Sequence, residues 1–320
     1  NQLSPLKIHS ICKLTKRKIL GYFVEREFQV TSQKLLTYYF LNWNYPKKLR
    51  NNTLSSLFHR NKPYSLQLQR EREKMYGFTS LRTESDGGIK GDIEEGTLYP
   101  GLGYGENQLR WGFIRKVYGI LAAQILLTTL VSAVTVLYTP INDLLRGSPG
   151  LLLFLIFLPF VLLWPLHIYQ QKHPLNFIFL GLFTASLSLT VGVTCANTDG
   201  RIVLEALLLT SAVVSALTGY TFWASKKGKD FSFLGPILFT SLFVLILTGF
   251  MQMFFPLGST TSAVYSAMSA IIFCGYIIYD TDNLIKRFTY DEYIWASVTL
   301  YLDVLNLFLT ILRILRQGDN

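Results

Sequence analysis

The feature that most constrains this chain is a series of long, nearly uncharged apolar blocks in its C-terminal two thirds. Each block has 18 or more residues, which is enough for an α-helix to cross a bilayer core about 30 Å thick. Only 16% of the residues are charged, against about a quarter in soluble domains. We therefore predict an all-α integral membrane protein built as a bundle of seven transmembrane helices. The seven blocks are Val117–Tyr138, Leu151–Ile168, Leu175–Cys195, Ile202–Ala224, Leu234–Phe255, Thr261–Tyr279 and Tyr293–Leu312.

The remaining sequence divides the chain into four parts. Residues 1–74 carry 15 Lys and Arg against 4 Asp and Glu and contain no Met. We interpret them as a basic extension, outside the native protein if translation begins at Met75; a functional basic arm and a targeting segment are the alternatives. Residues 75–110 are expected to form a cytosolic polar linker, residues 111–315 the membrane domain, and residues 316–320 a short tail.

The loops between the blocks predict the orientation. Nine Lys and Arg fall on one side of the predicted membrane and four on the other. Because cytosolic loops are enriched in Lys and Arg, we expect a cytosolic N-terminus. With seven spans the C-terminus lies on the opposite side, although Arg313 and Arg316 count against that placement, so a re-entrant seventh segment is an alternative.

Two aspartates, Asp280 and Asp303, stand out because charge within a membrane helix is costly and marks ion pathways or proton relays. They lie at nearly equal distances from the polar turn "FTYDEY", so a helical hairpin brings them to a similar depth. Two carboxyl groups in a low dielectric are expected to share a proton and titrate as a coupled, pH-sensitive pair. A structural bridge from Asp280 to Lys286 or Arg287 fits the spacing equally well.

Polar residues at helical spacing accompany each aspartate. We interpret them as a seam between the last two blocks, suited either to a buried hydrogen-bonded contact or to a narrow ion path. The last block contributes Thr299, Asp303, Asn306, Thr310 and Arg313, and the preceding block contributes Asp280, Asn283 and Arg287.

Glu205 and His167 are pore or structural candidates. Glu205 follows Arg201 by four residues, so an i,i+4 ion pair is the simpler interpretation. His167 lies at the cytosolic end of its block, where we expect an interfacial position.

Small residues repeat every fourth position in two blocks, which predicts close helix packing. The repeats are Ser211, Ser215 and Gly219 in one block, and Ser262, Ser266 and Ala270 in another.

Two long segments carry a resemblance to a known family. "GYIIYDTDNLIKRFTYDEYIWASVTLYLDVLNLFLTILRIL" resembles the C-terminal signature of the Bax inhibitor family, and "LYPGLGYGENQLRWGFIRKVYGIL" resembles its plant Lifeguard branch. The resemblance covers about residues 98–315 and leaves out residues 1–74. It implies a seven-helix fold with a central seventh helix. It also implies a calcium leak across intracellular membranes, gated by a pH-sensitive aspartate pair, with suppression of cell death and a link to endoplasmic reticulum stress.

The family's two aspartates match Asp280 and Asp303. In a bacterial relative an arginine near the end of the second helix latches onto the pair, but the matching stretch here, "HIYQQKHP", has no arginine. Lys172, His167 or Arg287 are the substitutes that the sequence offers.

These observations together predict a pH-sensitive calcium leak channel that modulates intracellular calcium and suppresses cell death. Asp280 and Asp303, with Asn306 and backbone or water oxygens, would bind calcium weakly and transiently, because Ca²⁺ prefers six to eight oxygen ligands. We expect no enzymatic activity, no resident cofactor and no nucleic-acid partner. The expected partners are membrane lipids, calcium ions and membrane proteins that regulate cell death or stress. The expected location is the endoplasmic reticulum, with the vacuolar or plasma membrane as alternatives.

Three other functions stay open. A membrane protein that regulates cell-death or stress partners without conducting ions fits the same residues, as does a proton-coupled transporter. An intramembrane aspartyl protease is the third, because such enzymes also place two aspartates on adjacent helices. The Tyr279-Asp280 dipeptide fits that class, but the glycines expected before the second aspartate and a Pro-Ala-Leu motif are missing.

Overall fold

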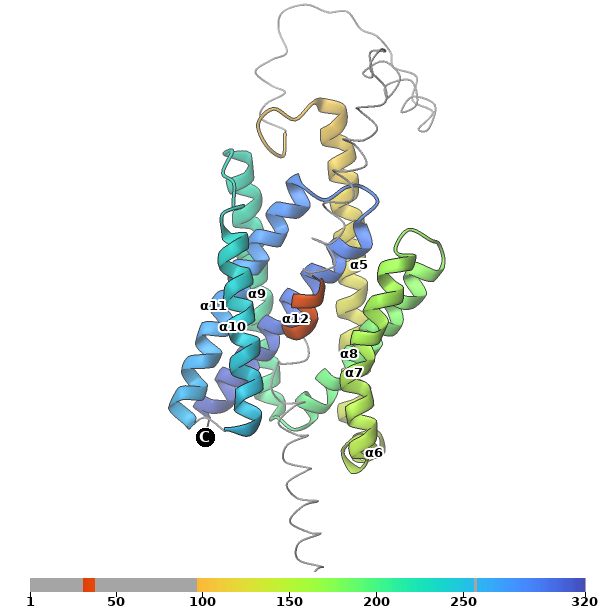
Figure 1. Cartoon of the computed structure of the whole chain (residues 1–320), viewed down its shortest axis with the longest axis vertical. Coiled ribbons are helices and arrows are strands. Elements are labelled where there is room, and N and C mark those ends of the chain that lie inside the picture. The colour runs from red at the N-terminus through yellow and green to blue at the C-terminus, as the bar shows by residue number, and fades with distance from the viewer. Residues whose placement is uncertain (1–30, 38–96, 256–257, 320) are drawn as a thin grey trace, which may run out of the picture. The chain divides into compact units, whose positions relative to one another are not determined.

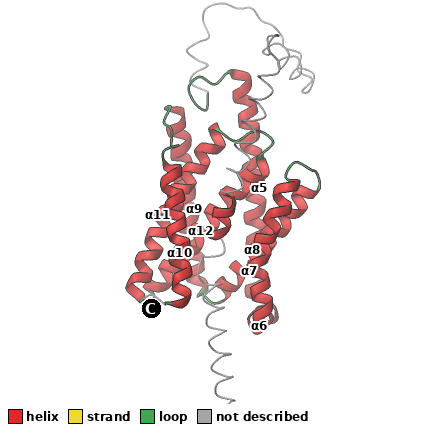
Figure 2. Ribbon diagram, in the orientation of Figure 1, coloured by secondary structure: helices red, strands yellow, loops and turns green. Residues whose placement is uncertain are grey.

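The computed structural model describes residues 31–37, 97–255 and 258–319, and all regular structure in these ranges is helical (Figure 2). The predicted start at Met75 and most of the predicted linker lie outside these ranges. Residues 31–37 form a short helical segment. The other helices are α5 (Tyr104–Leu137), α6 (Thr139–Gly147), α7 (Pro149–Tyr169), α8 (Leu175–Ala196), α9 (Gly200–Lys226), α10 (Leu234–Phe254), α11 (Ser259–Lys286) and α12 (Tyr293–Gly318).

Each of the seven apolar blocks coincides with a helix, and six of these helices are long and apolar enough to cross a membrane: α5, α8, α9, α10, α11 and α12. The apolar stretch of α7, Leu153–Tyr169, is shorter. The all-helical membrane architecture is therefore confirmed with six spanning candidates, and the seventh span stays a prediction. Large apolar side chains such as Leu130, Leu208 and Val244 are exposed on these helices, as expected of faces in contact with lipid rather than water.

Local sequence accounts for several helix ends. The Asp199 carboxylate caps α9 by accepting a hydrogen bond of 2.8 Å from the backbone N–H of Arg201, which satisfies one of the unpaired donors of the first turn. Helices α6 and α7 each carry a proline in the first turn, where its missing N–H costs no hydrogen bond.

Helix α12 is the most buried of the six spanning candidates and packs against α5, α8, α9 and α11 (Figure 1). All five members of its predicted polar face, from Thr299 to Arg313, are buried. Polar side chains therefore run along the most buried of the spanning candidates, at positions shielded from lipid.

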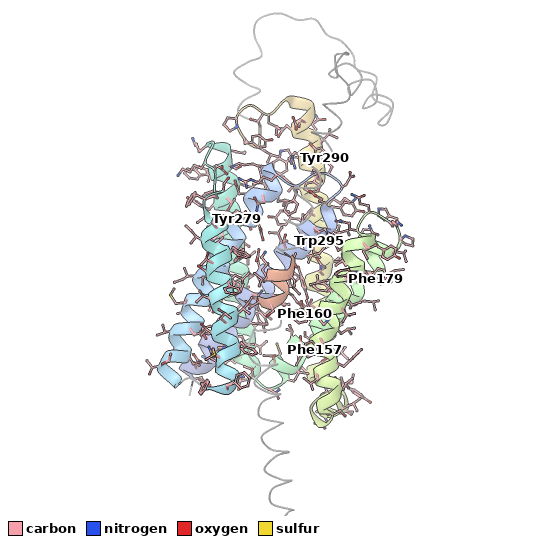
Figure 3. All side chains as sticks on the ribbon, in the orientation of Figure 1. Phe157, Phe160, Phe179, Tyr279, Tyr290 and Trp295 are labelled. Carbon is pink, nitrogen blue, oxygen red and sulfur yellow. The ribbon has the colours of Figure 1, made fainter. Side chains whose placement is uncertain are left out.

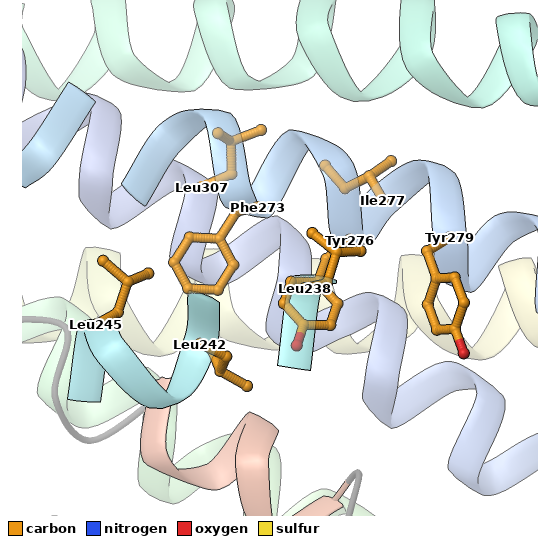
Figure 4. Close-up of a cluster of buried hydrophobic side chains, with 8 residues drawn as sticks. All are labelled: Leu238, Leu242, Leu245, Phe273, Tyr276, Ile277, Tyr279 and Leu307. Carbon is orange, nitrogen blue, oxygen red and sulfur yellow. The ribbon is translucent and has the colours of Figure 1, made fainter. Parts of the chain in front are cut away.

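A cluster of buried apolar side chains joins α10, α11 and α12 (Figure 4). Leu242 of α10, Phe273 and Tyr276 of α11, and Leu307 of α12 belong to it. Leu35 of the 31–37 segment packs against the same cluster. This packing holds α11 and the short segment in place beside α12.

Helices α5 and α8 approach each other closely at Gly192. A Cβ atom added to Gly192 of α8 would lie 2.8 Å from Thr135 Cβ and 3.1 Å from the backbone of Ser132, both on α5. The small-residue repeat of α9 does not make such a contact, because Ser211, Ser215 and Gly219 are all exposed. The prediction for α9 was wrong, since spacing alone does not say which face of a helix meets a neighbour.

Candidate functional site

Asp280 of α11 and Asp303 of α12 are both buried, with relative exposures of 5% and 0%. The turn between α11 and α12 reverses the chain, and the two carboxyl groups come close enough to contact the same third group. The structure thus brings together the two aspartates that the sequence singled out. They lie inside the bundle, where solvent cannot screen their charges.

A third charged group joins the pair, and it is Lys34 of the 31–37 segment. Its ammonium lies 2.8 Å from Asp303 Oδ1 and contacts Asp280 Oδ2. It also donates a hydrogen bond of 3.2 Å to the backbone carbonyl of Thr299 and lies 4.9 Å from the ring centroid of Tyr276. Lys34 is itself buried, with 1% exposure, so three charged side chains meet in the interior of the bundle.

None of the basic residues expected beside the pair occupies this position. Arg287 contacts Asp230, at 3.6 Å, and Lys286 contacts Asp282 at 2.6 Å, so the alternative bridge from either residue to Asp280 was wrong. Lys172 lies over the ring of Tyr169 instead.

No sequence signal pointed to Lys34, because its segment is distant in the chain from the aspartates and shows no strong periodicity. Lys34 is also one of 15 Lys and Arg in residues 1–74, so its charge does not distinguish it from its neighbours in the sequence. Only the contact of the folded segment with the bundle reveals it.

Two members of the predicted seam take part directly. Asn306 Oδ1 accepts a hydrogen bond of 3.1 Å from the Thr31 hydroxyl, and Asn283 Nδ2 donates one of 3.4 Å to Asp280 Oδ1. The buried Asp303 Oδ2 has no hydrogen-bond partner among the residues that the structure describes.

Glu205 and His167 lie outside this cluster. Glu205 forms the i,i+4 ion pair with Arg201, at 3.0 Å on an exposed surface. The His167 ring stands 5.5 Å from that of Trp295, which is buried within the bundle (Figure 3).

Charged contacts also fasten the loops at the polar end of the α11–α12 hairpin. Lys286 donates to the backbone carbonyl of Lys229 in the α9–α10 loop, and Asp230 of that loop pairs with Arg287. The Ser232 hydroxyl donates to Asp230, and this bond, helped by the nearby Arg287, lowers the pKa of the Asp230 carboxyl below its ordinary value. The hairpin that carries both buried aspartates is thus anchored at its turn.

Helix α5 adds a further anchor to this turn. Arg110 Nη1 donates a hydrogen bond of 2.6 Å to the backbone carbonyl of Phe288. Its guanidinium also lies 5.0 Å from the ring centroid of Tyr290, which Figure 3 labels near the start of α5. The turn is therefore held from α5 as well as from the α9–α10 loop.

The oxygens around the Lys34 ammonium suit a cation that binds with few ligands. Two carboxylates and one backbone carbonyl converge there. Within the described ranges no cluster of three or more His, Cys, Asp or Glu is placed to hold a metal ion. Stable calcium sites use six to eight oxygens, more than the three groups that converge here.

A second polar network joins α5, α8 and α12. The Thr128 hydroxyl is 2.7 Å from the Tyr301 hydroxyl, and Ser188 Oγ donates to Thr128 Oγ1 at 3.1 Å. Thr128 and Tyr301 also line an apolar cavity of about 590 Å³ between α5, α8, α9 and α12.

Most of the chain is similar to known proteins. The family model described as "Inhibitor of apoptosis-promoting Bax1" matches residues 110–320. BI1-like protein of Arabidopsis thaliana is 71% identical over 255 residues, which are 78% of this chain and 100% of that protein. Protein LIFEGUARD 4 of Arabidopsis thaliana is 51% identical over 239 residues, covering 72% of this chain and 96% of that protein.

A viral protein is similar as well. The Golgi anti-apoptotic protein of vaccinia virus (strain Lister) is 43% identical over 211 residues, which are 66% of this chain and 87% of that protein. The range matched by the family model contains Asp280 and Asp303, whereas Lys34 lies outside it.

Proposed function

Because this chain belongs to the Bax inhibitor family, we propose that it is a multi-pass endomembrane protein that suppresses cell death by acting as a pH-sensitive calcium leak. The family membership and a relative named for anti-apoptotic activity support the role in cell death. That relative is also named for the Golgi, which supports an internal membrane; we propose the endoplasmic reticulum, with the N-terminus in the cytosol.

The observation that carries the leak proposal is the convergence of Asp280 and Asp303 on one cation inside the bundle. Two buried carboxylates are strongly unfavourable unless a proton or a cation compensates them. Proton uptake and cation binding therefore compete for the same pair of groups, and the affinity of the pair for a cation depends on pH.

The surrounding groups suit brief cation occupancy. The Thr299 carbonyl adds a neutral oxygen at the Lys34 ammonium, and the Asn306 side-chain oxygen, one turn along α12 from Asp303, is a further candidate ligand. Such a site has too few ligands to retain Ca²⁺, and conduction requires a site that an ion can leave. Calcium is here the permeant ion, not a resident cofactor.

The test uses the full chain reconstituted in liposomes that contain a calcium indicator, with the external pH stepped from about 6 to 8 around the range in which a coupled buried pair is expected to titrate. Asp280→Asn and Asp303→Asn should change the size or the pH dependence of calcium entry. Glu205→Gln is the matched control, because it removes a carboxylate that is paired on an exposed surface. An absence of flux at every pH in the parent and in all variants, with folded protein, would refute the leak.

A second candidate is a regulator that does not conduct ions. It is favoured by the position of Lys34, which fills the space between the two carboxylates. In this case Asp280→Asn would leave protection of cells against a death stimulus intact, whereas the leak proposal predicts a changed level of protection in the same assay.

A further inference from the structure

The cluster around Lys34 is built from two parts of the chain, and the family model matches only one of them. Asp280, Asp303 and Thr299 lie within the range matched by the family model, residues 110–320. Lys34 belongs to a segment that precedes this range, although it falls in the same compact unit as the bundle. The membrane domain thus supplies an anionic site, and the N-terminal segment supplies the cation that fills it.

We infer that residues 31–37 are an internal plug, in which the Lys34 ammonium occupies the cation site between Asp280 and Asp303 and excludes other cations. The site is chemically a receptor for a primary ammonium carried on a short helix. The expected consequence, a blocked calcium leak, rests on the proposed function. The docking of the segment can be tested separately, without measuring calcium flux.

The contacts of the segment are specific in both charge and shape. The ammonium meets both carboxylates and a backbone carbonyl, and the face of Tyr276 covers it at 4.9 Å, a favourable position for a cation. One turn earlier, Thr31 donates to Asn306 on α12. Leu35 packs on the apolar cluster of α10, α11 and α12.

The same segment also carries features that oppose tight binding. The buried amide of Gln33 and the Ser32 hydroxyl have no hydrogen-bond partner within the described part of the chain. Burying polar groups without partners is unfavourable, so these two residues weaken the docking that Lys34 drives. A segment held mainly by the ion pairs of a single lysine, and opposed by buried polar groups without partners, is suited to release.

A cation that reaches the carboxylates must displace Lys34, because the cation and the Lys34 ammonium would contact the same carboxylate oxygens. Two carboxylates with one ammonium leave a single excess negative charge, which a proton can neutralise. A divalent cation can neutralise both carboxylates at once, and it therefore competes with both the ammonium and the proton. Calcium and the plug are therefore expected to exclude each other.

The docking test measures how fast an amine-reactive ester acylates Lys34 in the purified full chain, with each lysine followed by mass spectrometry. Lys227, which is exposed, is the internal reference. Lys34 should react at least about tenfold more slowly, because only local opening exposes it. Asp280→Asn combined with Asp303→Asn should remove most of this protection, and Glu205→Gln should leave it unchanged.

Calcium should raise the acylation rate of Lys34 and leave that of Lys227 unchanged, with potassium chloride at equal ionic strength as the control for screening. Equal reactivity of Lys34 and Lys227 in the parent protein would overturn the plug. Protection that survives the double aspartate substitution would also overturn it, because the carboxylates would then not be the receptor.

The consequence for transport is tested in the liposome assay with two substitutions of one residue. Lys34→Met removes the cation and should raise calcium entry several-fold, whereas Lys34→Arg keeps a cation and should stay near the parent rate. Protection in the acylation assay together with no flux in any variant would refute the leak and leave docking supported. Unchanged flux in Lys34→Met, in a protein whose leak responds to Asp303→Asn, would refute the blocking role.

Discussion

Removing the charge of Lys34 should destabilise the fold only when its two carboxylate partners are present. The ammonium lies 2.8 Å from Asp303 Oδ1, and at an effective dielectric constant of about 20 that separation corresponds to roughly 6 kcal/mol of attraction. Desolvation of the buried charges offsets part of this gain. Breaking buried ion pairs by removing one partner costs about 3–5 kcal/mol. Because the carboxyl groups can take up a proton once Lys34 is lost, we expect the lower end of that range.

The assay is a double-mutant cycle on the free energy of unfolding in mixed detergent micelles, followed by the fluorescence of tryptophans that include the buried Trp295. Lys34→Met should cost about 3 kcal/mol in the parent protein. In the background of Asp280→Asn and Asp303→Asn it should be neutral or stabilising, because an unpaired buried ammonium is then removed. Lys227→Met, at an exposed position, should have little effect in either background. An equal cost of Lys34→Met in both backgrounds would refute the interaction, since independent sites are additive.

Two further predictions concern the scaffold. Gly192→Ala should be about 1–3 kcal/mol less stable than Gly181→Ala in the same micelle assay, because the new methyl group meets Thr135 at 2.8 Å whereas Gly181 faces open space. Both substitutions gain the same helix propensity, so this gain cancels in the comparison. Equal stabilities of the two variants would contradict the close α5–α8 contact. Asp230→Asn should lower the melting temperature slightly at pH 7 and have no effect in acid. The lowered pKa of Asp230 means that its stabilisation is present above the unfolded value of about 3.9 and is lost as pH falls through the folded pKa; a difference that persisted in strong acid would exclude this cause.

The helices could be predicted from the sequence because membrane insertion constrains the length and composition of each spanning segment, which can be read directly along the chain. A helix that crosses the bilayer satisfies its backbone hydrogen bonds internally and must be apolar over a fixed length. All seven apolar blocks therefore coincide with helices, and only the marginal length of α7 leaves the number of spans open. The similar depth of Asp280 and Asp303 followed from the short turn between α11 and α12, which ties depth to sequence distance.

Contacts that depend on helix rotation could not be predicted in this way. The repeat of Ser211, Ser215 and Gly219 has the spacing of a packing stripe, yet these residues are exposed. Gly192, an isolated glycine, makes the close approach instead. Lipid and protein are similarly apolar surroundings, so hydrophobic periodicity does not reveal which face of a membrane helix meets its neighbours.

The sequence by itself determined that the chain forms a helical membrane domain and that two aspartates lie at a similar depth within it, because both follow from apolar length and local spacing. Only the tertiary structure decided which cation compensates those aspartates. Lys34 is 246 residues from Asp280 in the chain, and no local pattern connects them. The choice depends on desolvation and charge, since two buried carboxylates require a positive partner and the fold brings one to them from a distant segment.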